Sequence, residues 1–165
     1  MPESRYENSS EPLPLLDLEH FLPYRLSVLA NIVSQAIAQG YQARFNLSVT
    51  EWRVLAVLGR YPGLSGLEVG ERIAVDKVAV SRAVARLVEA DRITRELEPA
   101  DRRRSVLNLS EAGRLVYDEV APMALAQEQR LLSVLSAEER AALDMILRKL
   151  AGDGVATMSV SASLL

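Results

Sequence analysis

The motif Asp101-Arg102-Arg103-Arg104 contains the longest run of cationic side chains in this sequence. A guanidinium group stays charged at physiological pH, and its planar fork of N–H donors matches the oxygens of a phosphate or a carboxylate. Short runs typical of β-strands lie on either side, at 93–97 and 104–109, so we expect a hairpin with a six-residue tip over 98–103. The chemistry predicted for this tip is the binding of phosphate groups.

A second set of polar groups lies upstream, on one face of a helix predicted over 77–90. Asp76 is the predicted N-cap, because its side chain can accept hydrogen bonds from the free amides of the first turn. At about 100° per residue, one arc is apolar and forms the core face, which comprises Val80, Val84, Leu87 and Val88. The opposite arc holds small and charged residues, which are Val78, Ala79, Arg82, Ala85, Arg86 and Glu89.

This second arc suits contact with the major groove of duplex DNA. Small side chains let the backbone approach base edges, and their methyl groups can pack on thymine methyls. Arg82 and Arg86 are placed to reach guanine edges or phosphates, and Ser81 lies on the flank. Lys77 lies at the helix start, where free amides favour phosphate. A solvated charged face on an ordinary helix is the alternative.

The hairpin favours DNA binding, because a helix and a basic ribbon held side by side are the two reading elements of a winged helix-turn-helix. We expect Arg103 to enter the minor groove, with Arg102 and Arg104 on phosphates or on Asp101. A solvated basic turn is the alternative for the hairpin. The predicted DNA contacts are Ser65, Lys77, Val78, Ala79, Ser81, Arg82, Arg86, Asp101, Arg102, Arg103 and Arg104.

Capping residues place further helices around these two elements. Ser48, Ser65 and Ser136 are each followed three residues later by a glutamate, which is the capping-box pattern, and Ser110 is a further predicted cap. Near the N-terminus, apolar residues at spacings of three and four predict one long helix over 18–45.

The expected fold is mainly α, with a winged helix-turn-helix module and a small β-hairpin wing, flanked by N- and C-terminal dimerisation helices. A disordered or extended arm (1–16) precedes the N-terminal dimerisation helix (17–46) and the module (47–110). The C-terminal dimerisation helices (111–151) and a flexible tail (152–165) follow. The length of the apolar stripes favours a symmetric dimer over helices that fold back on their own module.

Composition limits the classes of function. The chain has 165 residues, no cysteine and a single histidine, which leaves little material for nucleophilic or metal catalysis. Residues 76–104 hold eight Lys/Arg against six Asp/Glu, whereas the rest holds eleven against sixteen. Positive charge is therefore concentrated on the predicted reading elements. We expect no enzyme activity, no cofactor, no metal site and no membrane span, and a cytoplasmic location.

The order of these elements resembles the MarR family of bacterial transcriptional regulators. The matching residues are Asp76-Lys77, Val80-Ser81-Arg82-Ala83-Val84 with Leu87, and Asp101-Arg102-Arg103-Arg104-Ser105 before Leu107-Asn108-Leu109-Ser110-Glu111-Ala112-Gly113-Arg114. The resemblance covers about residues 20–150. It implies a homodimer that binds a pseudo-palindromic operator, usually a repressor released by a small aromatic acid or phenol. Ala74 departs from the pattern, because the turn there often has glycine.

The resemblance also implies an effector pocket between the dimerisation helices and the winged module. An arginine with aromatic walls would suit a carboxylated aromatic ligand. The residues predicted to line this pocket are His20, Tyr24, Arg25, Trp52 and Arg53, with an ordinary core position as the alternative for Trp52. A single imidazole cannot build a zinc site. A winged-helix module used only for protein–protein assembly is the alternative function.

Overall fold

The protein is described by a computed structural model that covers the backbone of residues 15–98 and 101–162 and the side chains of residues 15–97 and 105–158. Its contacts divide the chain into two compact units, Met1–Gln35 and Ala36–Leu165. The predicted arm over 1–16 therefore lies almost entirely outside the described residues. Within residues 15–98 and 101–162, helices are too short or too polar to cross a membrane.

The first long helix is shorter than predicted. Helix α1 spans Leu22–Gln39, with Pro23 in its first turn, where a missing amide hydrogen costs nothing. The chain then turns at Gly40, and a separate short helix α2 follows at Gln42–Phe45. The amides of Gly40 and Tyr41 bond to carbonyls three residues back, which tightens and ends the helix. The prediction of one helix over 18–45 was wrong for this reason.

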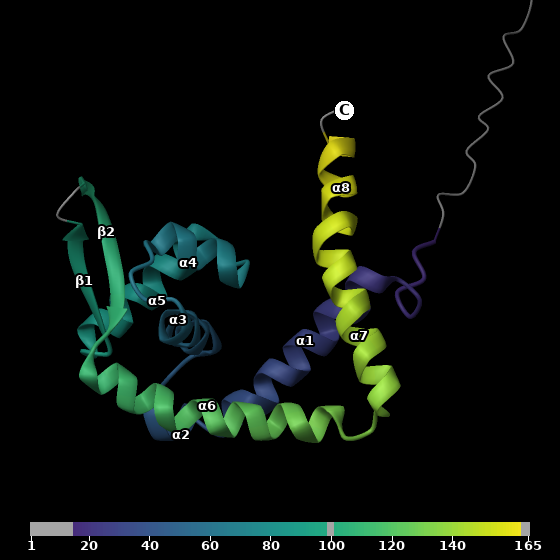
Figure 1. Ribbon diagram of the computed structural model, residues 1–165, viewed down its shortest axis with the longest axis horizontal. Coiled ribbons are helices and arrows are strands. Elements are labelled where there is room, and N and C mark those ends of the chain that lie inside the picture. Colours follow the sequence, from purple (N-terminus) through teal and green to yellow (C-terminus); the bar gives the residue numbers. More distant parts are fainter. Residues whose placement is uncertain (1–14, 99–100, 163–165) are drawn as a thin grey trace, which may run out of the picture. The chain divides into compact units, whose positions relative to one another are not determined.

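The module that follows has the predicted order of elements. Helices α3 (Val49–Arg60), α4 (Gly66–Ile73) and α5 (Lys77–Glu89) precede strands β1 (Ile93–Glu98) and β2 (Asp101–Leu109), which pair as an antiparallel hairpin (Figure 1). The capping boxes predicted at Ser48 and Ser65 are both present. A bridge between Leu64 and Leu107 attaches the hairpin to the segment that precedes α4. These contacts hold the wing against the helix-turn-helix.

One hydrophobic core holds the module together. Its buried side chains come from all three helices and from the hairpin, and each buried valine or leucine contributes about 1.5–3 kcal/mol. They include Val54, Leu55, Leu58, Val69, Val80, Val84, Leu87, Ile93 and Leu107. Outside the module, Tyr41 and Val120 join the same cluster. The core therefore includes residues from both sides of the winged helix-turn-helix in sequence.

Three helical segments follow the wing. Helix α6 spans Glu111–Leu132 with Ser110 as its cap, and α7 spans Ala137–Lys149 after the capping box at Ser136. A π-helical turn at Leu150–Gly154 then continues into α8, Val155–Ala162. Residues 152–162, which the sequence analysis placed in a flexible tail over 152–165, are therefore helical, and neither Gly152 nor Gly154 adopts the positive φ that commonly ends a helix.

We predict that Gly113→Ala unfolds more readily than the parent. An added Cβ would lie 1.7 Å from the carbonyl oxygen of Arg92, which already accepts a bond from the Ser110 amide. The backbone would have to move to relieve this steric clash. We therefore expect a loss of roughly 1–3 kcal/mol in the free energy of unfolding, measured by urea denaturation. Gly152→Ala is the control, because nothing lies within 4 Å of its added Cβ. Equal stability of the two variants would contradict the tight packing at Gly113.

Candidate nucleic-acid interface

Helix α5 divides into a buried face and a solvent face. The Asp76 carboxylate accepts bonds of 3.0 Å from the amides of Val78 and Ala79, so the predicted N-cap is confirmed. The buried face consists of Val80, Ala83, Val84 and Leu87. Val88 was assigned to the core face, and this was wrong, because it is 40% exposed. The solvent face carries the predicted contact residues Lys77, Val78, Ser81 and Arg82, with Ala79 half-buried beside them.

The hairpin is longer than the sequence indicated. Its register pairs Ile93 with Leu109 and Leu97 with Ser105, and an irregularity after Leu97 brings Glu98 opposite Asp101. The expected six-residue tip is therefore wrong, because pairing continues to Glu98 and the three arginines belong to β2. The side chains of Asp101, Arg102, Arg103 and Arg104 lie outside the described residues, so their contacts stay predictions.

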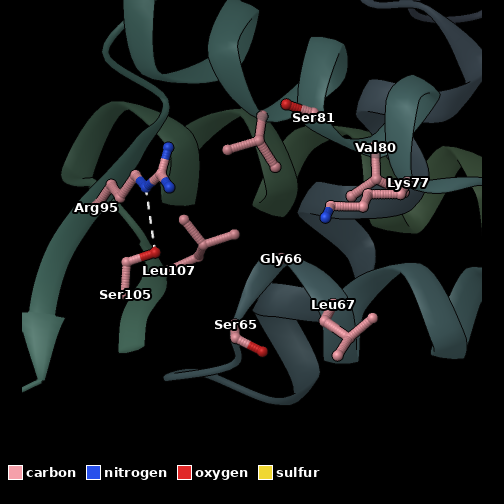
Figure 2. Close-up of a pocket in the computed structure, with 10 residues that line it drawn as sticks. Ser65, Gly66, Leu67, Lys77, Val80, Ser81, Arg95, Ser105 and Leu107 are labelled. Atoms are coloured by element: carbon pink, nitrogen blue, oxygen red, sulfur yellow. Dashed lines mark hydrogen bonds between the residues drawn. The ribbon is translucent and has the colours of Figure 1, made fainter. Parts of the chain in front are cut away.

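A hollow of about 520 Å³ lies between α4, α5 and the hairpin (Figure 2). Lys77 and Ser81 border it from α5, whereas Arg95 and Ser105 border it from the two strands. Arg95 Nε donates a 3.2 Å hydrogen bond to Ser105 Oγ. The described lining comprises Ser65, Gly66, Leu67, Lys77, Val80, Ser81, Val84, Arg95, Ser105 and Leu107, which includes two cations and no carboxylate. A hollow with this lining favours an anion.

Arg95 and Ser105 were missed by the sequence analysis. Arg95 lies opposite Leu107 in the hairpin register, and Leu107 is buried, so this face of the hairpin is turned toward the helices. The available signal was the alternation of side chains along a strand, counted from a buried leucine. Counting along both strands requires the correct pairing of β1 with β2, and the sequence analysis placed the tip of the hairpin at the wrong residues.

Ser65 forms the predicted capping box at the start of α4. Its hydroxyl accepts from the Glu68 amide at 3.3 Å and donates to the Glu68 carboxylate at 2.7 Å. The Ser65 amide donates to the same carboxylate oxygen at 2.7 Å, which completes the capping box. The cap leaves the amides of Gly66 and Leu67, in the first turn of α4, without partners inside the helix. Amides at a helix N-terminus bind anions, so this end of the hollow offers backbone donors rather than the serine hydroxyl.

Arg86, another predicted DNA contact, lies near α3 with its side chain largely exposed. Its Nη1 atom is 3.7 Å from Oε1 of Glu51, which is the buried carboxylate of the first capping box. Arg82, one turn earlier, is exposed on the solvent face of α5. The two arginines that the sequence grouped together therefore have different surroundings.

The predicted effector residues fall in two different units of the chain. His20 pairs with Asp17 at 2.8 Å, and both side chains are exposed. Tyr24 and Arg25 border an apolar hollow of about 470 Å³ along α1. Trp52 and Arg53 belong to the second unit, at the start of α3.

Trp52 packs in an aromatic cluster. Its ring centroid lies 5.7 Å from that of Tyr41 and 6.1 Å from that of Tyr117. The Tyr41 hydroxyl is buried and makes no hydrogen bond within the described residues. Burial raises the pKa of Tyr41, and the charge of Arg53 opposes that rise. The sequence analysis did not single out Tyr41, because residue 41 falls inside the one long helix that it predicted over 18–45.

Comparison with known sequences relates this module to one family. A sequence model of the MarR family matches residues 45–104, which include α3, α4, α5 and most of the hairpin. The winged helix-turn-helix of this chain is therefore similar to that of the MarR family, in which such a module is the structural basis of DNA binding. The relatives of this chain are transcriptional regulators and not enzymes.

Two curated relatives show how far the likeness extends. A putative transcriptional regulatory protein for the hcr operon of Thauera aromatica is 30% identical over 97 residues, which are 59% of this chain and 58% of that protein. The HTH-type transcriptional repressor NicR of Pseudomonas putida is 28% identical over 115 residues, which are 70% of this chain and 73% of NicR.

Solved structures of the family share the fold over most of their length. A MarR/EmrR family transcriptional regulator from Acinetobacter sp. ADP1 is 28% identical, with a TM-score of 0.77, over 84% of this chain and 97% of that one. The PcaV transcriptional regulator from Streptomyces coelicolor, solved in complex with its natural ligand, is 25% identical, with a TM-score of 0.68 and the same coverage. The mainly helical fold with a two-stranded wing is therefore that of the family.

The turn between α4 and α5 yields a prediction. Ala74 ends α4 with φ of 52°, a left-handed conformation that favours glycine. We expect Ala74→Gly to increase the free energy of unfolding by roughly 0.5–1 kcal/mol, because glycine relieves the steric cost of that conformation. Ala90→Gly is the matched control at the end of α5, where φ is −84° and glycine should destabilise. Thermal unfolding of both variants checks whether Ala74→Gly raises the melting temperature and Ala90→Gly lowers it.

Proposed function

We propose that this chain is a homodimeric MarR-family repressor that binds a pseudo-palindromic operator and is released by a small carboxylated aromatic ligand. The observation that carries the DNA-binding surface is the cationic hollow between α4, α5 and the hairpin, which Lys77 and Ser81 border from α5. Two cations, the hydroxyls of Ser81 and Ser105, and two helix-terminal amides border a space large enough for a phosphate group.

The contacts divide into positioning and reading groups. Lys77, Arg95 and the first amides of α4 hold backbone phosphates, which set the register of the protein on DNA. Val78, Ala79, Ser81 and Arg82 face base edges in the major groove from the exposed side of α5. In this proposal Arg103 enters the minor groove, and Asp101, Arg102 and Arg104 are its neighbours on β2.

The proposed dimer follows from apolar side chains that are exposed on the terminal helices. Along α1 they include Leu22, Leu26, Leu29 and Ile32, and Ile32 is 62% exposed. On α7 and α8 they include Met145, Ile146, Leu147, Val155 and Met158. A monomer rarely leaves such stripes in water, and packing against a second copy related by two-fold symmetry would bury them.

The proposed effector site is supported by the aromatic cluster. The buried Tyr41 hydroxyl has no described partner, and an effector carboxylate or phenol would satisfy it. Trp52 offers an aromatic wall, and Arg53 supplies a positive charge close enough to act on the Tyr41 hydroxyl. PcaV carries a natural ligand and NicR is a repressor, which supports ligand release of repression in this chain. His20, Tyr24 and Arg25 stay predicted contributors from the first unit.

Fluorescence anisotropy on labelled duplex tests the DNA interface. The duplexes are the protein's own upstream intergenic region and a random sequence, at several salt concentrations. We expect Lys77→Ala and Arg95→Ala each to weaken binding to both duplexes and to lower the salt slope by about one, because each removes a phosphate contact. Arg82→Ala should cost about 1–3 kcal/mol on the operator and relax its preference over random DNA.

Arg130→Ala is the matched control, because it removes an exposed arginine of α6 that does not line the hollow. Unchanged affinity and salt slope in the Lys77 and Arg95 variants would refute the interface. Absence of binding by the parent to either duplex would favour the alternative function, a protein–protein assembly module. The same complex provides the assay in which aromatic acids are screened for release.

The dimer yields a separate prediction. Ile32→Glu places a charge in the exposed apolar stripe of α1, so we expect it to shift the chain toward monomer in light scattering coupled to size exclusion. Gln35→Glu adds the same charge at an exposed polar position of the same helix and should leave the dimer unchanged. A dimer of normal affinity in the Ile32 variant would exclude this stripe from the interface.

A further inference from the structure

Glu51 differs from a capping glutamate elsewhere in the chain. Ser48 and Ser136 both begin capping boxes, and in each the glutamate carboxylate accepts from the serine amide, at 2.6 Å for Glu51 and 2.8 Å for Glu139. Glu139 is exposed, whereas Glu51 is only 5% exposed. A buried carboxylate needs more partners than a cap provides, because burial removes the water that would otherwise solvate it.

The second oxygen of this carboxylate faces helix α5. The amide of Ser48 bonds to Oε2, while Oε1 lies 3.7 Å from Nη1 of Arg86. The Arg86 side chain is 72% exposed and Glu51 is 6% exposed, so the arginine reaches back from the surface to a fixed, buried anion. One carboxylate thus joins the start of α3 to the last turn of α5.

A second tie connects the same two regions. The Arg92 guanidinium donates to the carbonyl of Phe45 at the end of α2, and the Arg92 amide donates to Leu87 at 2.8 Å. Both ties border one polar hollow of about 270 Å³, lined by Asn46, Glu51, Arg86, Leu87, Glu89, Ala90 and Arg92. The C-terminal end of α5 is therefore anchored at two points to the junction of α2 and α3.

We infer that Glu51 is a positioning residue for DNA recognition, which acts through Arg86 to set the orientation of α5. This inference rests on the proposed function of α5 as the reading helix. Lys77 lies nine residues from Arg86, about 13 Å along the axis, so a small tilt at the anchored end displaces the phosphate-binding end. Arg86 then contributes to affinity through Glu51 and not through DNA, in contrast to the prediction from sequence.

A double-mutant cycle on operator binding tests the inference. Glu51→Gln keeps an acceptor for the Ser48 amide and removes the charge, while Arg86→Ala removes the partner on an exposed surface. We expect each variant to weaken operator binding about three- to tenfold with an unchanged salt slope, and the double variant to be no weaker than Arg86→Ala. Arg86→Lys should recover most of the affinity, because it restores a cation near Glu51.

Glu139→Gln is the matched control, because it neutralises an exposed capping box far from α5 in sequence and should leave affinity unchanged. Two results would overturn the inference. In the first, Arg86→Ala lowers the salt slope of operator binding by about one, while Glu51→Gln binds the operator normally. In the second, the losses of binding free energy in the two single variants are strictly additive in the double variant. The first would assign Arg86 to a DNA phosphate.

If the parent bound neither operator nor random duplex, the proposed function itself would fail. Urea unfolding of each variant shows whether weaker binding comes from a loss of folded protein or from a changed orientation of α5. If Glu51→Gln does not fold, Arg86→Ala and Arg86→Lys still test the inference.

Discussion

The packing of one face of α5 into the core is the constraint on which the DNA-binding surface depends. Val80, Val84 and Leu87 are buried in a cluster that includes Leu55 and Leu58 of α3 and Leu107 of the hairpin. Because these side chains cannot leave the core without a large loss of hydrophobic free energy, the opposite face of α5 must point to solvent. The same cluster holds the wing beside α5, so helix and hairpin keep a defined relative position in the proposed DNA interface.

Charge distribution reconciles an acidic chain with an anionic partner. The net charge is −3, yet the described lining of the hollow between α4, α5 and the hairpin contains Lys77 and Arg95 and no carboxylate. The field near a phosphate depends on the closest charges, since salt screens those beyond about 8–10 Å. An excess of acidic residues elsewhere therefore does not prevent DNA binding, and it disfavours contact of DNA with other surfaces.

The polar contacts around α5 divide into two kinds. At its N-terminal end, Asp76 satisfies the free amides and leaves Lys77 exposed, so this end is available to a ligand. At its C-terminal end, Arg86 and Arg92 are engaged with the α2–α3 junction through Glu51 and Phe45. One end of the helix faces outward while the other is held to the module, an arrangement that combines contact with defined orientation.

Much of this protein follows from sequence, because local rules decide local structure. Capping boxes at Ser48, Ser65 and Ser136 mark three helix starts, and a serine three residues before a glutamate is enough to predict them. The period of apolar residues likewise separates the two faces of α5. The resemblance to the family extended these signals to the order of helices and wing.

Other features were decided by contacts between residues distant in sequence. The turn at Gly40 lies beside Met123 of α6, and the register of the hairpin depends on Leu107 being buried against α4 and α5. Arg86 and Glu51 are 35 positions apart in sequence and belong to different helices. A helical wheel of α5 alone therefore does not reveal their pairing. The sequence by itself determined where helices begin and which face of α5 is apolar, because those depend on neighbours within a turn or two. Only the tertiary structure decided which polar groups remain available for DNA, because that depends on which partners folding brings to each side chain.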